Sequence, residues 1–280
     1  MSISFSCPHC GLETTVADRY AGQSGSCLRC GKPIVYPPPK PASKLKILII
    51  GLVVLVAMVF LGIMQLPPIA REAARRAQCA NNLKEIGLAL LNYESGNTCF
   101  PPAVFTDDHG KPMKSWRVAI LPYMEQQVPC QQYDLEQPWD SPQNRALGNI
   151  SVPVFRCPSD PGADANSTET NYVRIVGKDT IGGMPNEAVK LRDITDGTSN
   201  TILVVEVAGL HINWVEPRDV TVEELMEMVA KGRASFHSGG FQAVFADGSV
   251  HFISYGVNPK TLRALLLRND GQPVGKFGNY

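Results

Sequence analysis

Residues 47–66 read ILIIGLVVLVAMVFLGIMQL and contain no charged side chain. A helix rises about 1.5 Å per residue, so an apolar run of about 20 residues crosses the hydrocarbon layer of a bilayer, which is about 30 Å thick. The run is too long and too far from Met1 for the apolar part of a cleaved signal peptide, and Pro67 and Pro68 follow it in place of small residues. We therefore predict a transmembrane helix over residues 45–66, with a buried core helix as the alternative.

Four of the eight cysteines precede this run in two closely spaced pairs, Cys7 with Cys10 and Cys27 with Cys30. Each pair encloses two residues and sixteen residues separate the pairs, a spacing typical of a tetrahedral zinc site. Gly11 and Gly31 follow the pairs, where the chain must turn sharply. We predict a zinc ribbon over residues 1–36 in which the four thiolates bind a structural Zn²⁺ and His9 stays outside the ligand set. A pair of disulfides is the alternative.

Cysteine chemistry also sets the predicted orientation in the membrane. Lysines and arginines near the two ends of the apolar run are equally numerous, so the positive-inside rule does not decide. Thiolates held for zinc in this head favour a reducing compartment, which places the N-terminus in the cytoplasm and residues 67–280 outside a cytoplasmic membrane that the chain crosses once. The remaining cysteines are Cys79, Cys99, Cys130 and Cys157. They allow three disulfide pairings, and free buried thiols remain an alternative.

Composition favours a tether and argues against nucleic-acid binding. Residues 37–44 are rich in proline and predict an extended linker. Residues 1–46 hold six lysines and arginines against two acidic residues, but a zinc ion with four thiolates adds about two negative charges. Three aromatic residues in this head are too few for a base-stacking platform. The head gives no strong nucleic-acid signal, so protein contact or a structural role is the expectation.

The pattern after the apolar run predicts a long helix followed by antiparallel strands. Apolar residues recur at helical spacing from Ile69 to Glu94, in a stripe that we assign to Ile69, Ala73, Ala77, Ala80, Leu83, Gly87, Leu90 and Leu91. Short helical segments are predicted over residues 116–124 and 222–231, the latter capped by Thr221. Strands are predicted over residues 171–176 and 201–207.

A β-hairpin is predicted over residues 241–254, because two alternating runs flank Asp247-Gly248. A two-residue turn would pair Phe245 with Val250 and Ala243 with Phe252. One face of this hairpin would then consist of Phe241, Ala243, Phe245, Val250 and Phe252.

Several short motifs together resemble a bacterial pseudopilin-like family of unknown function that carries an H-x9-DG motif. They are REAARR (71–76), CANNLKEIGLAL (79–90), SWR (115–117), LPYME (121–125), PWDSP (138–142), FRCPSD (155–160), DGTSNTI (196–202) and His237 followed by Asp247-Gly248. The resemblance covers roughly residues 60–256. It implies an α+β fold like that of type II secretion major pseudopilins and type IV pilins, in which a long N-terminal helix, membrane-embedded in its first half, packs on an antiparallel sheet.

The start of the chain departs from the pseudopilin pattern. Family members begin with a basic stretch and a prepilin cleavage sequence with a glutamate, whereas here a predicted zinc ribbon precedes the apolar run. We therefore expect a permanently anchored monomer or small oligomer, whose protein partners or self-association involve the N-terminal helix.

A second metal site can be imagined around His237, Asp247 and His251 with Glu206 and Asp196, but ordinary turn chemistry explains the aspartates, and we favour structural roles. The segment containing Asp160, Asp164 and Asn166 is a weak calcium pattern. Hydrolase, phosphate-loop and His-Glu-x-x-His motifs do not occur in the sequence. We predict a non-enzymatic structural or protein-interaction role in the cell envelope or a secretion-type assembly. The alternative is a transmembrane sensor with an external ligand-binding domain.

Overall fold

The computed structural model describes residues 2–38, 44–64, 68–124, 132–162, 164, 166–275 and 277. The chain divides into two compact units, residues 1–66 and 67–280. The described part has a mixed α+β fold whose sheets are antiparallel, except for the parallel pair of residues 175–176 with residues 220–221. Cys130 and most of the predicted linker lie outside the described residues.

The first unit begins with two small antiparallel hairpins. Their elements are β1 (Ser2–Ser6), β2 (Glu13–Ala17), the 3₁₀ turn η1 (Asp18–Tyr20), β3 (Ser24–Ser26) and β4 (Pro33–Val35). β1 pairs with β2, and β3 pairs with β4. Both connections contain a glycine at positive φ, Gly11 at 71° and Gly31 at 67°, a conformation that glycine adopts without steric cost. Each cysteine pair thus lies in the connection of its own hairpin.

Helix α1 (Lys44–Met64) follows in the same unit. Its side chains are described over residues 48–62, and the large apolar ones are exposed, with Leu48 at 72%, Val53 at 61% and Phe60 at 60%. Within the described residues, no helix combines the length and the apolarity needed to cross a membrane. The predicted transmembrane helix is therefore not confirmed, and its last two positions, residues 65 and 66, lie outside the described part.

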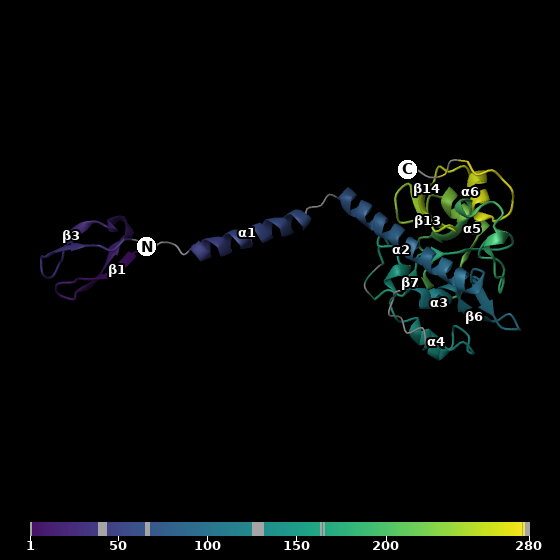
Figure 1. Ribbon diagram of the computed structural model, residues 1–280, viewed down its shortest axis with the longest axis horizontal. Helices are drawn as coiled ribbons and strands as arrows, with labels where there is room; N and C mark the ends of the chain where they lie inside the picture. Colours follow the sequence, from purple (N-terminus) through teal and green to yellow (C-terminus); the bar gives the residue numbers. More distant parts are fainter. Residues whose placement is uncertain are drawn as a thin grey trace. The chain divides into compact units, whose positions relative to one another are not determined.

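The second unit combines a long helix with a four-stranded sheet (Figure 1). The helix is α2 (Pro68–Asn97), and the strand order is β14 (Val250–Ser254), β13 (Gly240–Phe245), β10 (Ile202–Glu206) and β8 (Tyr172–Val173). All neighbouring strands in this sheet are antiparallel. α2 contacts β10, β13 and β14.

Two apolar clusters occupy the two faces of this sheet. On one face, Leu83 and Leu90 of α2 belong to the same buried cluster as Val204 and Val244. On the other face, Val205 and Ala243 cluster with α5 (Val222–Ala230) and α6 (Pro259–Leu266). Alternation along each strand explains the division, because successive side chains point to opposite faces. The sheet is therefore the middle layer between α2 and the α5–α6 pair.

Helix α2 approaches the sheet closely at Gly87. A Cβ atom at this position would lie 2.7 Å from Cγ2 of Val244, closer than real contacts allow. The absence of a side chain at Gly87 thus fixes the distance between helix and sheet.

The other elements of the second unit are short. The helices are α3 (Trp116–Ile120) and α4 (Pro142–Leu147), and the 3₁₀ turns are η2 (Leu121–Tyr123), η4 (Pro153–Phe155), η5 (Leu191–Asp193) and η6 (Thr198–Asn200). The strand pairs are β5 (Val104–Thr106) with β6 (Pro112–Ser115), β7 (Glu169–Thr170) with β11 (Ile212–Asn213), and β9 (Ile175–Val176) with β12 (Val220–Thr221). In Figure 1, α5 and α6 gather near β13 and β14, whereas α3, β6 and α4 lie toward the other end of the unit.

Several predicted elements are confirmed, and one helical face is corrected. Residues 116–124 contain α3 and η2, residues 201–207 contain β10, and Thr221 caps α5 through a reciprocal pair of bonds with Glu224. The side chain of Ile69 lies outside the described part, and the predicted stripe on α2 is correct at Leu83, Gly87 and Leu90 but wrong at Ala73 and Ala77. Ala73 and Ala77 are exposed and Cys79 is buried. In this part of α2, the face that packs against the rest of the unit is therefore the one that carries Cys79, not the predicted alanine stripe.

The predicted hairpin exists, but its register was wrong by one residue. β13 and β14 pair Val244 with Val250 and Gln242 with Phe252. The Phe245 amide donates to the carbonyl of Ser249 at 2.8 Å, so the loop has three residues, with Gly248 at a φ of 79°. A three-residue loop whose last residue is a glycine at positive φ is the common alternative to the two-residue turn. Phe252 consequently leaves the predicted apolar face and lies under the guanidinium of Arg76, 3.8 Å from the ring centre.

Candidate metal centres

The four N-terminal cysteines converge in the first unit. Their sulfur atoms all lie within 4.8 Å of one another, with Sγ–Sγ distances of 3.9 Å for Cys7 and Cys30 and 3.6 Å for Cys10 and Cys27. Each hairpin contributes one pair, because a tight turn brings both of its sulfurs to the same side. His9 is exposed, as the sequence predicted. Four convergent sulfurs fit the ligand set of a tetrahedral metal ion.

Backbone amides favour a thiolate in this cluster. The amide of His9 donates to Cys7 Sγ at 3.5 Å, and the amide of Arg29 donates to Cys27 Sγ at 3.4 Å. Hydrogen bonds from the amides of Cys30 and Arg29 lower the pKa of Cys27 to about 6. The second turn therefore favours the deprotonated form of Cys27 that a metal binds, whereas in the first turn a backbone hydrogen bond with Leu12 is outweighed by burial and the neighbouring cysteines, which raise the pKa of Cys10 to about 11.

A second cluster lies in the interior of the second unit. Its members come from four separate segments: Cys79 of α2, Cys157 after η4, Glu206 at the end of β10 and His237 before β13. All four are buried, and their potential ligand atoms lie within 4.8 Å of one another. His237 Nε2 is 3.5 Å from Cys157 Sγ and 3.6 Å from Glu206 Oε1.

Polar neighbours orient the members of this interior cluster. His237 Nδ1 donates to Oε1 of Glu72 at 2.6 Å, so Nε2 faces the other three groups. Glu72 also accepts from Arg75 Nη2 at 2.6 Å and from Ser159 Oγ at 3.0 Å. The Tyr172 hydroxyl donates to Cys79 Sγ at 3.2 Å.

The pKa values of the interior cluster indicate a shared charge. A hydrogen bond from Cys79, with help from His237, lowers the pKa of Cys157 to about 5 against the opposing effect of burial. Burial lowers the pKa of His237, but Cys157, Glu206 and Glu72 outweigh it and raise that pKa to about 9. The hydrogen bond to Cys157 and burial raise the pKa of Cys79, and burial raises the pKa of Glu206 to about 8. Both shifts favour the charged forms of Cys157 and His237 beside each other.

The structure gathers only part of the second metal set that the sequence suggested. His237 and Glu206 meet, but Asp247 caps the hairpin loop by accepting from the Ser249 amide at 2.8 Å. His251 Nε2 contacts Ser249 Oγ at 3.1 Å. Asp196 instead accepts from the Asp270 amide at 2.7 Å. The predicted turn role is confirmed for Asp247, whereas Asp196 accepts from the backbone of a distant segment.

Sequence reasoning missed Cys79 and Cys157 as partners of this cluster. Both had been considered for disulfides, with free buried thiols as the alternative, and among the described cysteines none forms a disulfide. Cys99 lies elsewhere, with its Sγ 3.4 Å from the carbonyl of Asn97. The available signal was the position of both cysteines within the CANNLKEIGLAL and FRCPSD motifs.

The SWR motif forms another buried polar centre. Ser115 caps α3, and the side chains of Arg117 and Asp219 form a fully buried ion pair at 2.8 Å. Trp116 Nε1 also donates to Asp219 at 3.1 Å, and Arg117 Nη2 donates to the carbonyl of Tyr172 at 2.9 Å. Because each charged group has several partners, this centre serves to join α3 to the strands.

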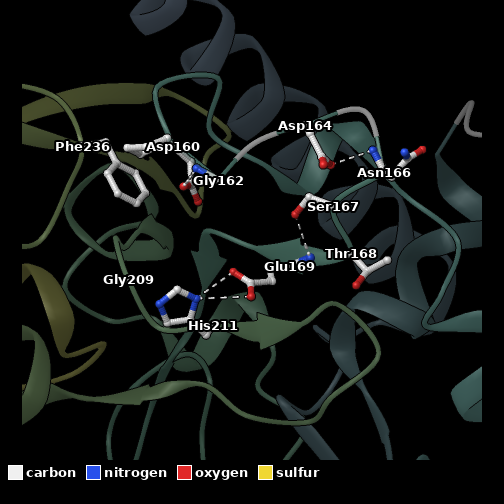
Figure 2. Close-up of a pocket in the computed structure, with 11 residues that line it drawn as sticks. Asp160, Gly162, Asp164, Asn166, Ser167, Thr168, Glu169, Gly209, His211 and Phe236 are labelled. Atoms are coloured by element: carbon white, nitrogen blue, oxygen red, sulfur yellow. Dashed lines mark hydrogen bonds and ion pairs between the residues drawn. The ribbon is translucent and has the colours of Figure 1, made fainter.

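A surface pocket of about 600 Å³ borders the predicted calcium segment (Figure 2). Figure 2 shows His211 directed at Glu169, with Nδ1 3.0 Å from Oε2. Asp160 accepts from Asn171 Nδ2 at 2.9 Å, and Asp164 accepts from the Asn166 amide at 2.9 Å. Among the described residues, these carboxylates do not gather as a group of metal ligands, unlike the two cysteine-containing clusters.

The fold and the two clusters define an α+β protein in which a long helix packs on an antiparallel sheet, preceded by a four-cysteine hairpin pair. The family model described as "Protein of unknown function (DUF1559)" matches residues 69–229, and the chain belongs to this family. The match confirms the resemblance to a family of unknown function, while the relation to pseudopilins stays a prediction. Searches of curated proteins and of solved structures found no match.

Proposed function

We propose that the chain is a membrane-anchored, pseudopilin-like protein with a non-enzymatic structural or interaction role in the cell envelope or a secretion-type assembly. Residues 45–66 cross the cytoplasmic membrane once, the ribbon lies in the cytoplasm, and the second unit lies outside. The observation that carries the proposal is the order of the elements. An apolar helix with exposed side chains, α1, precedes a long helix, α2, that packs on an antiparallel sheet.

The exposed side chains of α1 support the anchor. Large apolar residues such as Val53 and Phe60 are about half exposed or more all along its described part. So many exposed apolar side chains are unfavourable in water and need an apolar environment. The twenty uncharged residues from 47 to 66 are long enough as a helix to span the hydrocarbon layer of a bilayer. Lipid, or the corresponding helix of a second copy within lipid, satisfies this requirement.

The ribbon supports the orientation of the anchor. Its sulfur atoms are close enough to bind one Zn²⁺, which would hold two hairpins that have few other buried side chains. Cys30 is exposed, so its thiol would be open to oxidation in an oxidising compartment, and oxidation would prevent zinc binding. A cytoplasmic ribbon that contacts a protein partner is consistent with these features.

The interior cluster supports a role without catalysis. A paired thiolate and imidazolium resemble an activated nucleophile, but Cys157 and His237 are buried at 0% and 2% exposure. A substrate cannot reach them without opening the core between α2 and the sheet.

Protease accessibility in spheroplasts tests the proposed topology. One tag is placed before Met1 and another after Tyr280, and external protease is added before and after lysis. Loss of the C-terminal tag alone in intact spheroplasts is the expected result. Loss of the N-terminal tag alone would reverse the orientation, and extraction of the chain by alkaline carbonate would contradict the anchor.

The pocket near Glu169 and His211 favours a second candidate, a transmembrane sensor. Its acidic lining suits a cationic ligand, for which calcium ions serve as the probe. Hydrogen exchange is measured on the full chain with and without calcium, and on the Glu169→Gln variant. The sensor predicts that calcium changes exchange in both the pocket and the ribbon and that Glu169→Gln removes the response. An unchanged ribbon contradicts this second candidate.

A further inference from the structure

We propose that Cys79, Cys157, Glu206 and His237 bind a zinc ion inside the second unit, separate from the ion of the ribbon. The four residues come from α2, the segment after η4, β10 and the segment before β13. A single ion would therefore join parts of the chain that the sequence separates by up to 158 positions, from Cys79 to His237.

The distances between the groups suit a tetrahedral ion. Zinc binds sulfur at about 2.3 Å and nitrogen or oxygen at about 2.0–2.2 Å, so the edges of the ligand tetrahedron measure about 3.3–3.8 Å. The separation of Cys157 Sγ from His237 Nε2 is 3.5 Å, and that of His237 Nε2 from Glu206 Oε1 is 3.6 Å. All four potential ligand atoms lie within 4.8 Å of one another, so small side-chain movements complete the shell.

Glu206 provides an independent indication of a ligand. Its side chain is fully buried, and Oε1 has no hydrogen-bond partner among the described residues. The other oxygen, Oε2, accepts from the amide of Gln242 at 3.3 Å, which aims Oε1 at the cluster. Burial of a carboxyl oxygen without a hydrogen bond is costly, and coordination to a cation removes that cost.

The surrounding hydrogen bonds match those of metal-binding histidines. Such histidines donate their second ring nitrogen to a carboxylate, which fixes the ring orientation. His237 does this to Glu72 at 2.6 Å, and Arg75 and Ser159 hold Glu72 in turn. The Tyr172 hydroxyl at 3.2 Å from Cys79 Sγ supplies a comparable contact for a thiolate.

The donor set selects zinc among common metal ions. Two thiolates exclude magnesium and calcium, which take oxygen ligands, and sulfur, nitrogen and oxygen donors together are ordinary for zinc. Binding releases to solvent the protons that the four ligand groups carry, including the Cys79 thiol proton and the proton on His237 Nε2, and involves no change of oxidation state. The four protein ligands complete the tetrahedron, so the ion is structural and leaves no position for a reacting water.

Zinc content of the purified full chain tests the site. We expect about two zinc ions per wild-type chain, one in each cluster, and about one after Cys157→Ser or His237→Ala. Cys27→Ser in the ribbon should also retain about one ion, and this variant leaves the interior cluster unaltered. Cys99→Ser is the matched control and should keep about two ions, because Cys99 lies outside both clusters.

The competing arrangement is a disulfide between Cys79 and Cys157, whose sulfurs are close enough to react after modest movement. Peptide mapping of wild-type chain purified without reductant distinguishes it. Recovery of both cysteines as thiols after zinc removal supports the site. A Cys79–Cys157 crosslink, one zinc ion per wild-type chain, or loss of all zinc from Cys27→Ser would overturn the proposal even if Cys157→Ser does not fold.

Discussion

The ribbon cluster and the interior cluster bring together similar side chains by different routes. In the ribbon, two turns of a short sequence supply all four sulfurs, and Cys30 remains exposed. In the interior, four distant segments each supply one group, and every group is buried. The first arrangement is encoded locally, whereas the second exists only after α2 has packed on the sheet. A site whose ligands are close in sequence can be recognised from the sequence, whereas a site whose ligands meet only in the folded chain cannot.

The two clusters also differ in what surrounds them. In the ribbon, the buried apolar cluster consists of Cys7, Cys27 and Ile34, so the cysteines themselves are most of the core. The interior cluster lies beside an extensive apolar core that includes Leu83, Phe155 and Val204. The ribbon should therefore depend on its metal for folding, and the second unit should depend on its metal only for part of its stability.

Metal removal gives the largest expected effect. Binding free energies of structural zinc are about 10–16 kcal/mol, which exceeds what a core of three side chains can replace. Chelation of the full chain should therefore abolish protection of the ribbon amides that close the turns, such as those of Cys7 and Gly11. The sheet amides of the second unit should stay protected. Hydrogen exchange followed by mass spectrometry measures both regions in one sample. A ribbon that stays protected without metal would show that its folding does not depend on the metal.

The Arg117–Asp219 pair tests whether a buried polar centre without sulfur stabilises the same unit. Arg117→Met leaves Asp219 buried without its partner, and such losses cost about 3–5 kcal/mol. Denaturant unfolding should show this decrease, while zinc content stays at the wild-type level. Arg263→Met is the matched control, because Arg263 pairs with Glu223 at the surface, where pairs contribute about 0–1 kcal/mol. Equal effects of the two substitutions would show that the buried pair contributes no more than an exposed one.

Glu72→Gln tests the orientation of His237 and should weaken metal binding in the interior cluster but not in the ribbon. Loss of a carboxylate behind a metal-binding histidine weakens metal binding about 10–100-fold. The interior affinity should fall by this factor in the Cys27→Ser background, as measured by competition with a zinc chelator. Glu227→Gln on the exposed face of α5 is the control and should leave the affinity unchanged. An unaltered affinity in Glu72→Gln would mean that Glu72 does not orient the ligand.

Gly87→Ala gives the smallest expected effect and tests the packing that brings Cys79 to the sheet. Its Cβ would meet Val244 Cγ2 at 2.7 Å, and overpacking of this kind costs about 1–3 kcal/mol. Gly96→Ala in the same helix has room, with the nearest atom 3.6 Å away, and should raise stability by up to about 1 kcal/mol. Thermal unfolding of the two variants compares them directly. A Gly87→Ala chain as stable as Gly96→Ala would show that helix and sheet can separate freely.

The sequence predicted the features that local chemistry determines. The spacing of Cys7, Cys10, Cys27 and Cys30 predicted their convergence, and periodicity predicted α2 and β10. The hairpin register was wrong because Gly248 tolerates a positive φ in either a two-residue or a three-residue loop. Sequence pattern alone does not distinguish these loops.

The interior cluster could not be predicted as a unit, because its members share no local spacing. Residues 79, 157, 206 and 237 meet through the packing of α2 and the sheet order, which no single motif contains. The sequence placed His237 and Glu206 in a hypothetical set with Asp247, but the aspartate belongs to a turn. The sequence separation of Cys79 and Cys157 does not indicate that His237 lies close to both in the fold. For this reason the sequence suggested disulfides or free thiols for these cysteines and not a metal site.

Zinc X-ray absorption of a full chain carrying Cys27→Ser and Cys30→Ser measures the difference between the clusters most directly. With the ribbon disabled, we expect about one zinc ion per chain whose shell contains about two sulfur and two nitrogen or oxygen ligands. A chain that retains no zinc, or a shell of four sulfurs, would contradict a second, interior centre built from Cys79, Cys157, Glu206 and His237.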